Sequence, residues 1–481
     1  YEMSASLVGS EMCIRDRYNY IHIGNARPLC VFDVLRRYLE WRGYEVKFVQ
    51  NFTDIDDKIL DKAAAAGQQW WERAYIYERE FTEAYSKLGV EPPTYEPRAT
   101  GHMIDMIDLI KKIIDNGHAY VVRDADGNPT GNVYFDVASW PHYGELTHQK
   151  QTAVSDAASE VTDAMGPSVD NAGNDKYNPV DPADASPDKH DPRDFALWKA
   201  PKDSDPLDAR WNTPFGTGRP GWHIECSAMA RRYLGETIDI HCGGQDLIFP
   251  HHENEIAQSE CCNGAPFARY WMHNGYINVD NKKMSKSLNN FFTVRDVAEQ
   301  YGYEPIRFFL ISSSYRSPIN YNTAIIEQAK ASLDRLYNCK SALEFAAGNA
   351  GEGDGDPAFA AALASRRDQF IAAMEDDLNT ADAIAALFEL VRDINVKLGA
   401  QPARADVAAA SELFEELTGV LGLLYDRKTE LLDEDIEALI EARTAARKAK
   451  NWAEADRIRD ELTAKGIVLE DTPQGVKWRR A

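Results

Sequence analysis

The stretch Tyr20-Ile-His-Ile-Gly-Asn-Ala-Arg27 opens the part of the chain that decides the fold. Behind it, apolar side chains recur at helical spacing across residues 27–42: Val31, Phe32, Leu35 and Leu39. Gly43 is a helix stop signal, and the next apolar residues predict a strand: Val46, Phe48 and Val49. A loop, a helix and a strand in this order form one half of a nucleotide-binding βαβ unit, so the sequence predicts an α/β fold.

The first 17 residues do not supply a clear strand ahead of this helix. Residues 1–17 show neither the alternation of a strand nor the stripe of a helix. The chain also begins with Tyr instead of Met. We therefore expect the natural start to be missing and residues 1–17 to be an atypical terminus, a scar of sequence assembly or cloning in which residues 4–10 are a weak substitute for a central strand.

Length and composition restrict the class of protein. A chain of 481 residues is too long for one core, so we expect two to four domains. The formal charge of −24 predicts a soluble protein whose RNA contacts are restricted to local basic surfaces. Seven irregularly spaced cysteines, no secretory signal and no apolar run of membrane-spanning length favour the reducing cytoplasm and argue against a membrane partner.

Several segments show how the rest of the chain is organised. Asp126-Gly127-Asn128 predicts the turn of a hairpin. Residues 151–192 hold nine Asp or Glu against two Lys and no Leu, Ile, Phe or Trp, which predicts a disordered acidic insertion. Beyond residue 300 the apolar spacing becomes helical. Residues 443–481 hold ten Lys or Arg against six Asp or Glu, so RNA contact is expected there.

Two short motifs suit the binding of phosphate. His22-Ile-Gly24-Asn25 lies where a loop opens a helix, so a phosphate could lie against backbone N–H groups while His22 and Asn25 donate hydrogen bonds. Lys283-Met-Ser-Lys286-Ser287 follows a predicted strand at 276–279 and offers two lysines and two hydroxyls to a triphosphate. The structural alternatives are an ordinary turn for the first motif and an exposed lysine loop for the second.

Cys226, His251 and Glu255 form a candidate metal site. His251 and Glu255 are four residues apart, so they project from one face if Pro250 opens a helix. A thiolate, an imidazole and a carboxylate together suit tetrahedral zinc. The alternative is a buried cysteine beside a His–Glu pair on a helix surface.

These motifs, in this order on an α/β chain, resemble class I aminoacyl-tRNA synthetases. Longer blocks narrow the resemblance to the cysteinyl-tRNA synthetases: residues 20–25, 51–58, 221–229 and 249–255. The resemblance covers residues 18–481 apart from the acidic insertion, and it implies a division of the chain. The expected parts are a Rossmann-like catalytic domain at 18–310 with a connective insertion at about 98–210, a helical stem-contact and bundle region at 311–430, and a small anticodon-binding domain at 431–481.

The resemblance also implies roles for single residues. It implies one zinc ion per chain, held by Cys226, His251, Glu255 and a second cysteine. Cys13 has the right spacing for that cysteine, although Ile14-Arg15-Asp16-Arg17 replaces the family's Gly-Pro-Thr-Val. The residues implied to line the amino-acid pocket are Thr53, Trp222 and His241. Those implied to bind ATP with Mg²⁺ are His22, Gly24, Asn25, Gly243, Gly244, Asp246, Lys283 and Lys286, of which His22, Asn25, Lys283 and Lys286 would act in catalysis.

The activity implied by the resemblance is the joining of L-cysteine to tRNA(Cys) with ATP, by a monomer. Arg447, Trp452 and Asp456 match positions that read the anticodon, although Trp452 could instead pack a small helical core. One rival is a cysteine ligase of the same fold that acts on an amino sugar, and the tail through Trp478 argues against it. A second rival is a catalytically silent tRNA-binding relative, which the intact motifs disfavour.

Overall fold

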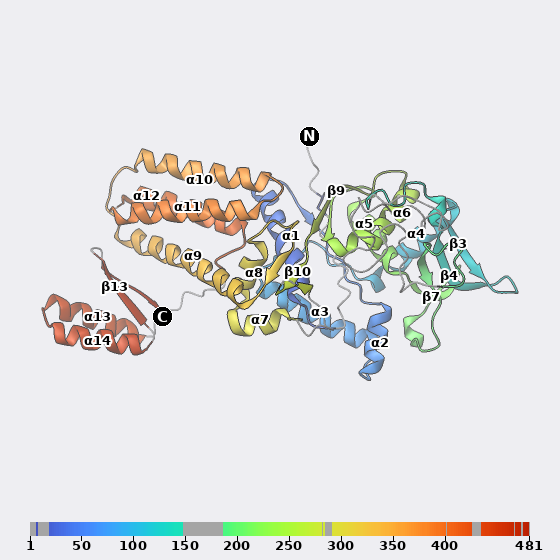
Figure 1. Ribbon diagram of the computed structural model, residues 1–481, viewed down its shortest axis with the longest axis horizontal. Helices are drawn as coiled ribbons and strands as arrows, with labels where there is room; N and C mark the ends of the chain where they lie inside the picture. Colours follow the sequence, from blue (N-terminus) through green and yellow to red (C-terminus); the bar gives the residue numbers. More distant parts are fainter. Residues whose placement is uncertain are drawn as a thin grey trace. The chain divides into compact units, whose positions relative to one another are not determined.

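A computed structural model of the chain describes residues 6–7, 19–147, 186–280, 282–283, 291–400, 402–425, 434–465, 467–472 and 475–480 (Figure 1). Cys13, Lys286 and most of the acidic insertion lie outside these described residues, and Lys283 is described in its backbone only. The chain forms two compact units. The first comprises Tyr1–Lys330, Met374–Ala381 and Val420–Gly422, and the second comprises Ala331–Ala373, Asp382–Gly419 and Leu423–Ala481.

A parallel sheet in the first unit confirms the predicted α/β fold. Its strands are β1 (Ser6–Leu7), β2 (Lys47–Phe48), β8 (Ile238–Gly244) and β9 (Ala268–Asn274), in the order β2-β1-β8-β9. Leu7 pairs with both Phe48 and Ile240. Ser6–Leu7 thus forms a two-residue strand inside residues 4–10, the segment expected to be a weak substitute for a central strand. Backbone hydrogen bonds to β2 and β8 place these two residues at the centre of the sheet, and a side-chain pattern cannot reveal such bonds.

Helix α1 (Ile23–Trp41) is the predicted helix of the first βαβ half and packs against β8, β9 and α8 (Tyr303–Ile311). The contact between α1 and α8 includes one buried ion pair. Arg307 is fully buried and forms an ion pair with Asp33, and it donates hydrogen bonds to the carbonyls of Leu88 at 3.3 Å and Leu421 at 3.0 Å. Each donor of this buried guanidinium group thus meets an acceptor, as burial of a charge requires.

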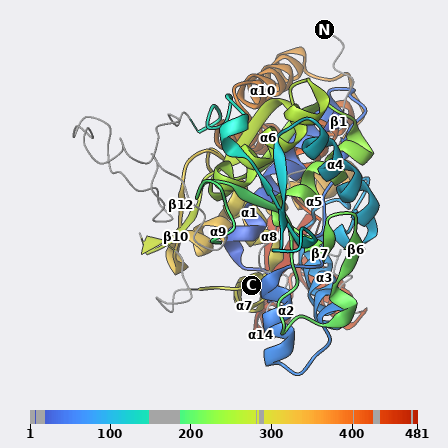
Figure 2. The same ribbon diagram turned by 90° about the vertical axis from the view of Figure 1, so that its right-hand side faces the viewer.

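An antiparallel sheet forms within the predicted connective insertion. Its order is β3-β4-β5-β7-β6, from β3 (Ala119–Arg123), β4 (Pro129–Phe135), β5 (Phe195–Lys199), β7 (Gly216–Pro220) and β6 (Trp211–Thr213). The predicted hairpin is confirmed, since β3 and β4 pair across residues 124–128. A hydrophobic core joins this sheet to α4 (Met103–Asp115), α5 (Trp222–Leu234) and α6 (Glu253–Asn263), which pack against one another (Figure 2).

Residues 186–192 differ from the expectation of a disordered acidic stretch. They form turns, in which His190 stacks on Tyr120 with ring centroids 3.6 Å apart and Asp191 pairs with Arg193 at 2.7 Å. The Tyr120 hydroxyl accepts a hydrogen bond from the His190 N–H at 2.8 Å. Composition could not show these contacts, because Tyr120 lies on β3, far away in the sequence.

The remaining elements of the first unit surround the parallel sheet and α1. They are α2 (Asp57–Ala65), α3 (Trp70–Lys87), α7 (Val294–Tyr301) and a small sheet of β11 (Lys282–Lys283), β10 (Ile277–Val279) and β12 (Ile319–Tyr321). Strand β10 falls where residues 276–279 predicted a strand. None of the described helices combines the length and the apolar character needed to cross a membrane.

The predicted helical region of the chain consists of long helices followed by a smaller α/β element. The long helices are α9 (Thr323–Asn349), α10 (Pro357–Glu375), α11 (Thr380–Gly399) and α12 (Arg404–Val420). The smaller element has α13 (Glu434–Lys448), α14 (Trp452–Ala464), β13 (Ile467–Thr472) and β14 (Gly475–Arg480). Its own core is formed by Ile458, Leu462 and Ile467.

Candidate metal centre and nucleotide-binding edge

Three elements of the first unit bring the candidate metal ligands together. Cys226 lies on α5, His251 lies in the helical turn Ile248–His252, and Glu255 lies on α6, which continues from that turn. Gly221 precedes α5, and a Cβ atom there would lie 2.0 Å from the carbonyl oxygen of Ala196. Only glycine therefore lets α5 start so close to β5, and this packing sets the position of Cys226.

The donor atoms of Cys226, His251 and Glu255 all lie within 4.8 Å of one another. All three side chains are fully buried. His251 Nε2 lies 3.6 Å from Glu255 Oε2, as expected for two residues one helical turn apart. The alternative of a His–Glu pair on a helix surface is wrong, because neither side chain reaches solvent. A thiol, an imidazole and a carboxylate thus converge in one buried space.

A second group of possible ligands shares Glu255. The donor atoms of His241, His252 and Glu255 also lie within 4.8 Å of one another, and His241 Nε2 is 3.1 Å from Glu255 Oε2. His252 Nδ1 is hydrogen-bonded to His273 Nε2 at 2.8 Å. Burial, together with the neighbouring His241, lowers the pKa of His252 well below its usual value, and burial lowers the pKa of His273 to about 4. Both rings are therefore neutral near pH 7, and a neutral ring keeps a lone pair for a ligand or a proton.

The side chains expected in the amino-acid pocket surround these groups. The Trp222 ring lies 4.3 Å from the His251 ring between centroids, and Thr53 Oγ1 donates to Glu225 Oε2 at 3.0 Å. Asn51 Nδ2 donates to Cys226 Sγ at 3.1 Å. Thr53, Trp222 and His241 thus each contact a candidate ligand or its sequence neighbour.

Sequence reasoning missed several polar residues of this centre. They are Asn51, His223, Glu225, His252 and His273. All but His273 lie within the quoted blocks at 51–58, 221–229 and 249–255, so their position beside the candidate ligands was the available signal. His223 Nδ1 lies 2.9 Å from His251 Nδ1, a contact between α5 and the turn before α6 that spacing along the chain does not predict.

Apart from Lys283, which lies on β11 of the small sheet, and Lys286, outside the described residues, the candidate nucleotide-binding residues lie at the carboxyl edge of the parallel sheet. His22 caps α1, and its Nδ1 accepts a hydrogen bond from the Asn25 N–H at 3.3 Å, so the predicted loop does open a helix. Gly243 and Gly244 end β8, and Asp246 follows in the turn Gln245–Leu247. Because α1 follows β1 and β8 runs parallel to β1, both groups lie at one edge, where such sheets bind nucleotides.

Gly243 and Gly244 lie where there is little room for a side chain. A Cβ atom on Gly243 would lie 2.8 Å from His252 Cε1, and one on Gly244 would lie 2.4 Å from Asp246 Oδ1. A side chain at either position would collide with a polar neighbour, so the backbone stays open to a close approach.

The anticodon candidates lie in the small C-terminal element. Arg447 is in the last turn of α13, while Trp452 and Asp456 are one turn apart on α14. The Trp452 side chain is 58% exposed, so the alternative in which it packs a small helical core is wrong. An exposed indole remains available for stacking.

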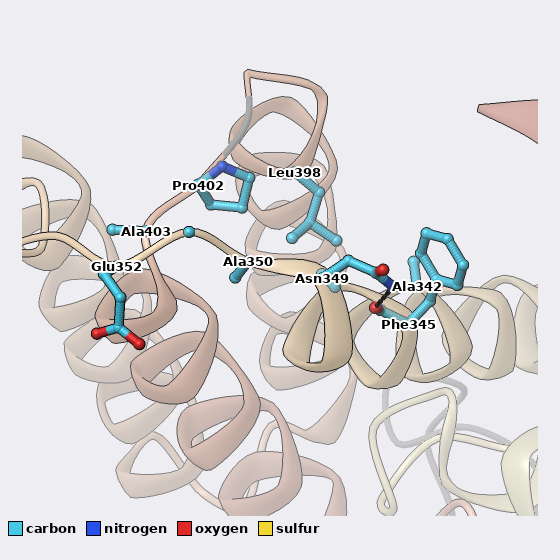
Figure 3. Close-up of a pocket in the computed structure, with 10 residues that line it drawn as sticks. Ala342, Phe345, Asn349, Ala350, Glu352, Leu398, Pro402 and Ala403 are labelled. Atoms are coloured by element: carbon cyan, nitrogen blue, oxygen red, sulfur yellow. Dashed lines mark hydrogen bonds between the residues drawn. The ribbon is translucent and has the colours of Figure 1, made fainter. Parts of the chain in front are cut away.

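A cavity of about 350 Å³ lies among the long helices of the second unit (Figure 3). Its wall comes from the ends of α9 and α11, the residues that follow α9 and the segment before α12, including Phe345, Leu398 and Pro402. Glu352 is the only titratable residue among those that line it. Its lining thus offers one carboxylate and neither a thiol nor an imidazole.

Comparisons with known proteins cover nearly the whole chain. Residues 2–331 match the family model of the class I (C) tRNA synthetase catalytic domain, residues 369–425 match the DALR domain, and residues 429–479 match the cysteinyl-tRNA ligase anticodon-binding domain. The chain is 54% identical over 495 residues to the cysteine–tRNA ligase of Bifidobacterium longum, covering 98% of this chain and 90% of that protein. It is 48% identical over 466 residues to the one from Caldicellulosiruptor saccharolyticus, covering 96% and 93%.

Among solved structures, the fold is similar to that of Mycobacterium tuberculosis methionyl-tRNA synthetase in complex with methionyl-adenylate. The TM-score is 0.57 at 17% sequence identity, and the match covers 87% of this chain and 88% of that one. At this identity the likeness concerns the fold alone.

Proposed function

The chain belongs to the cysteine–tRNA ligase family of class I aminoacyl-tRNA synthetases, and from this premise we propose which of its residues activate L-cysteine with ATP and pass it to tRNA(Cys). The observation that carries the proposal is the convergence of Cys226, His251 and Glu255, with donor atoms within 4.8 Å in a buried space. A soft thiolate, an imidazole and a carboxylate fit zinc, and with a fourth protein ligand the substrate sulfur would bind as a fifth. Cys13, which lies outside the described residues, is proposed as a further ligand.

Zinc bound there would hold the sulfur of cysteine as a thiolate, a bond that the hydroxyl of serine cannot match near neutral pH. The chain's own residues prepare the site. Asn51 donates a hydrogen bond to Cys226 Sγ, which favours the thiolate form, while His223 fixes the ring of His251. His241 contacts Glu255 and Trp222 stacks near His251, so both would form the wall around the substrate together with Thr53.

At the nucleotide edge, His22 is placed to donate to a phosphate. Because its Nδ1 accepts the Asn25 N–H, the neutral ring carries its proton on Nε2. We propose that this N–H, the side chain of Asn25 and the first turn of α1 at Gly24 stabilise the charge that develops on ATP. Lys283 and Lys286 would supply positive charge to the leaving pyrophosphate with Mg²⁺, while Gly243, Gly244 and Asp246 would bind the adenosine.

The chemistry requires no protein nucleophile. The carboxylate of cysteine attacks the α-phosphorus of ATP and pyrophosphate leaves, so the enzyme's task is to orient the reactants and stabilise charge. A ribose hydroxyl of the terminal adenosine of tRNA then attacks the anhydride and releases AMP. The amino-sugar ligase alternative is not favoured, because residues 429–479 match an anticodon-binding domain.

For the whole chain, we propose the division into a catalytic part at 18–310, a helical part at 311–430 and an anticodon-binding part at 431–481. Arg447, Trp452 and Asp456 would bind unpaired anticodon bases, since a guanidinium group, an exposed indole and a carboxylate offer a donor, a stacking plane and an acceptor. We further propose that the enzyme acts as a monomer in the cytoplasm.

Replacement of the candidate ligands tests the metal site. We expect Cys226→Ser and His251→Ala to lower zinc content below one ion per chain and to reduce cysteine-dependent pyrophosphate exchange by about 100-fold or more, since the loss of even an outer partner costs about 10–100-fold. ATP binding should largely survive. Metal analysis, exchange kinetics and the melting temperature are measured together, so that a misfolded variant is recognised.

Cys339→Ser is the matched control, because Cys339 is also buried but lies on α9 in the second compact unit, far from the candidate ligands in the sequence. It should keep both zinc and exchange. Full zinc and normal exchange in either ligand variant would show that the site is wrongly assigned. Cys13→Ser decides whether that residue belongs to the set: unchanged zinc content and exchange would exclude it.

A further inference from the structure

Two tyrosine side chains, each covered by an arginine, form a row beside His22. The Tyr20 and Tyr77 rings meet edge to face, with centroids 5.7 Å apart. The Arg295 guanidinium group lies 4.8 Å from the centre of the Tyr20 ring, and that of Arg73 lies 4.9 Å from the centre of the Tyr77 ring. These four residues, here called the Arg–Tyr strip, come from the segment that precedes α1, from α3 and from α7 (labelled in Figure 1).

The Arg–Tyr strip is joined directly to the nucleotide-binding edge. Residues 21–23 pair with residues 292–294, through the Val294 N–H to the Ile21 carbonyl at 2.9 Å and the Ile23 N–H to the Phe292 carbonyl at 3.2 Å. His22 lies opposite Thr293 in this pairing. Tyr20 and Arg295 therefore flank the same short ladder that holds His22, and a molecule that crosses the strip arrives at His22.

The strip is partly open to solvent. Tyr20 is 37% exposed and Arg295 is exposed, whereas Arg73 and Tyr77 are half-buried. Tyrosine normally buries much of its ring surface, so an exposed tyrosine ring beside an exposed guanidinium group, next to the nucleotide-binding edge, indicates a binding surface.

We propose that the Arg–Tyr strip binds the unpaired 3′ end of tRNA on its way to the site, a proposal that rests on the function proposed above. Unpaired bases stack on aromatic rings and guanidinium planes, and arginine also pairs with phosphate oxygens. The reaction requires the terminal ribose to reach the anhydride near His22. Double-stranded RNA shows its bases only at groove edges, so the paired acceptor stem cannot use the aromatic planes in this way.

Charge alone does not explain the surface. Glu80 and Glu299 lie close enough to influence Arg295, and the whole chain has a formal charge of −24. A surface built only for electrostatic attraction would lack nearby carboxylates. The combination of stacked planes with a few cations therefore fits a short unpaired segment better than a long run of phosphates.

A double-mutant cycle between the strip and the RNA end tests this proposal. Binding of tRNA(Cys), intact and without its last four nucleotides, is measured for the unchanged enzyme and for the double variant Arg73→Ala, Arg295→Ala. We expect the double variant to bind intact tRNA about 10-fold more weakly, since stacking contributes about 1–3 kcal/mol per base and each factor of ten is 1.4 kcal/mol. It should bind the shortened tRNA as well as the unchanged enzyme does. The slope of log affinity against log salt concentration should also flatten by about 0.7 for each phosphate that the variant no longer neutralises.

Two further variants sharpen the result. Arg295→Lys keeps the charge but loses the planar group, so it should bind intact tRNA with intermediate affinity. Arg269→Ala removes an exposed arginine at the start of β9, the opposite edge of the parallel sheet from His22, and should leave the affinities for both RNAs unchanged. If the double variant loses affinity equally for intact and shortened tRNA, the strip contacts another part of the RNA and the proposal is wrong.

Unchanged affinity for intact tRNA in the double variant would also overturn the proposal. The outcome is separable from the function proposed for the metal centre, because cysteine-dependent pyrophosphate exchange takes place without tRNA. If Cys226→Ser and His251→Ala leave exchange unchanged, the metal site is wrongly assigned, but the RNA-binding measurements can still be interpreted. If the RNA-binding prediction fails, the assignment of the metal site still stands on the exchange measurements.

Discussion

At the scale of single residues, Cys262 differs from the other described cysteines. It is half-buried at the end of α6, whereas Cys30, Cys226, Cys242, Cys261 and Cys339 are buried. Interaction with the Cys261 side chain, followed by the positive charges of Arg231 and Lys112, lowers the pKa of the Cys262 thiol against the opposing effect of burial. Cys262 Sγ donates to the Leu109 carbonyl at 3.7 Å. Because the thiolate is the nucleophile, Cys262 combines access with reactivity.

We therefore expect Cys262 to react first with an alkylating reagent under native conditions. Its labelling should persist to pH values below the usual thiol pKa of about 8.5, since a lowered pKa keeps thiolate populated in more acidic solution. Peptide mapping after timed labelling measures this. Cys339 serves as the comparison, because burial raises its pKa to about 12. Faster labelling of Cys339 than of Cys262 would contradict the prediction.

At the scale of elements, Asp57 joins the start of α2 to the antiparallel sheet. Its carboxylate lies 2.6 Å from Lys202 Nζ and 3.6 Å from Lys199 Nζ, and it accepts a hydrogen bond from Arg219. Burial opposes the ionisation of Asp57, but the charges of Arg219 and Lys199 outweigh it and hold the pKa of this carboxyl well below its usual range. Folding thus stabilises the ionised form of the Asp57 carboxyl group.

Asp57→Asn should lower the free energy of unfolding by about 1–2 kcal/mol at pH 7, between the values for surface and buried ion pairs. The pKa of Asp57 is lower in the folded than in the unfolded protein. Its contribution to the free energy of unfolding is therefore complete above the unfolded pKa of about 3.9 and declines as the pH falls below that value. The difference between variant and unchanged protein should therefore shrink in acid. Urea denaturation at pH 7, 5 and 3.5 measures it.

Asp108→Asn is the control for this series, since Asp108 is 63% exposed and pairs with Lys111 at 3.6 Å on the surface of α4. It should change stability by less than about 0.5 kcal/mol at each pH. An Asp57→Asn effect that stayed constant from pH 7 to 3.5 would mean that the carboxylate charge is not what stabilises the junction.

At the scale of the whole molecule, the residues proposed for activation and those proposed for RNA reading lie in different parts of the chain. The candidate metal and nucleotide residues belong to the first unit, and Arg447, Trp452 and Asp456 belong to the second. The basic excess had marked residues 443–481 as the RNA-binding tail, but α13 begins at Glu434 and Leu439 packs on the core formed by Ile458. A cut at 443 would split that core, so a clean truncation ends before α13.

A chain that ends at residue 425 should keep cysteine-dependent pyrophosphate exchange. It should charge tRNA at least about 100-fold more slowly, because each base that the enzyme no longer reads is worth about 1–3 kcal/mol. Parallel exchange and charging assays measure the two steps. Equal loss of both activities would mean that the C-terminal element is needed to build the catalytic site, and unimpaired charging would remove it from RNA recognition.

The sequence by itself determined the local features of this protein and its family. Helix α1, the hairpin of β3 and β4 and strand β10 could be predicted because apolar spacing and turn residues act over a few positions. The resemblance to cysteinyl-tRNA synthetases rested on blocks of consecutive residues, and the match of 98% of the chain to a cysteine–tRNA ligase confirms it. The place of His251 and Glu255 on one helical face followed from the same local geometry.

Only the tertiary structure decided which distant residues meet. Asn51 and Cys226 are 175 residues apart, and the Arg–Tyr strip joins Tyr20 to Arg295 across most of the first unit. The strand at Ser6–Leu7 is likewise set by pairing with β2 and β8 and not by its own side chains. Periodicity reports the conformation of a segment, whereas these contacts depend on how the segments pack, which is determined by burial and backbone pairing across the whole unit.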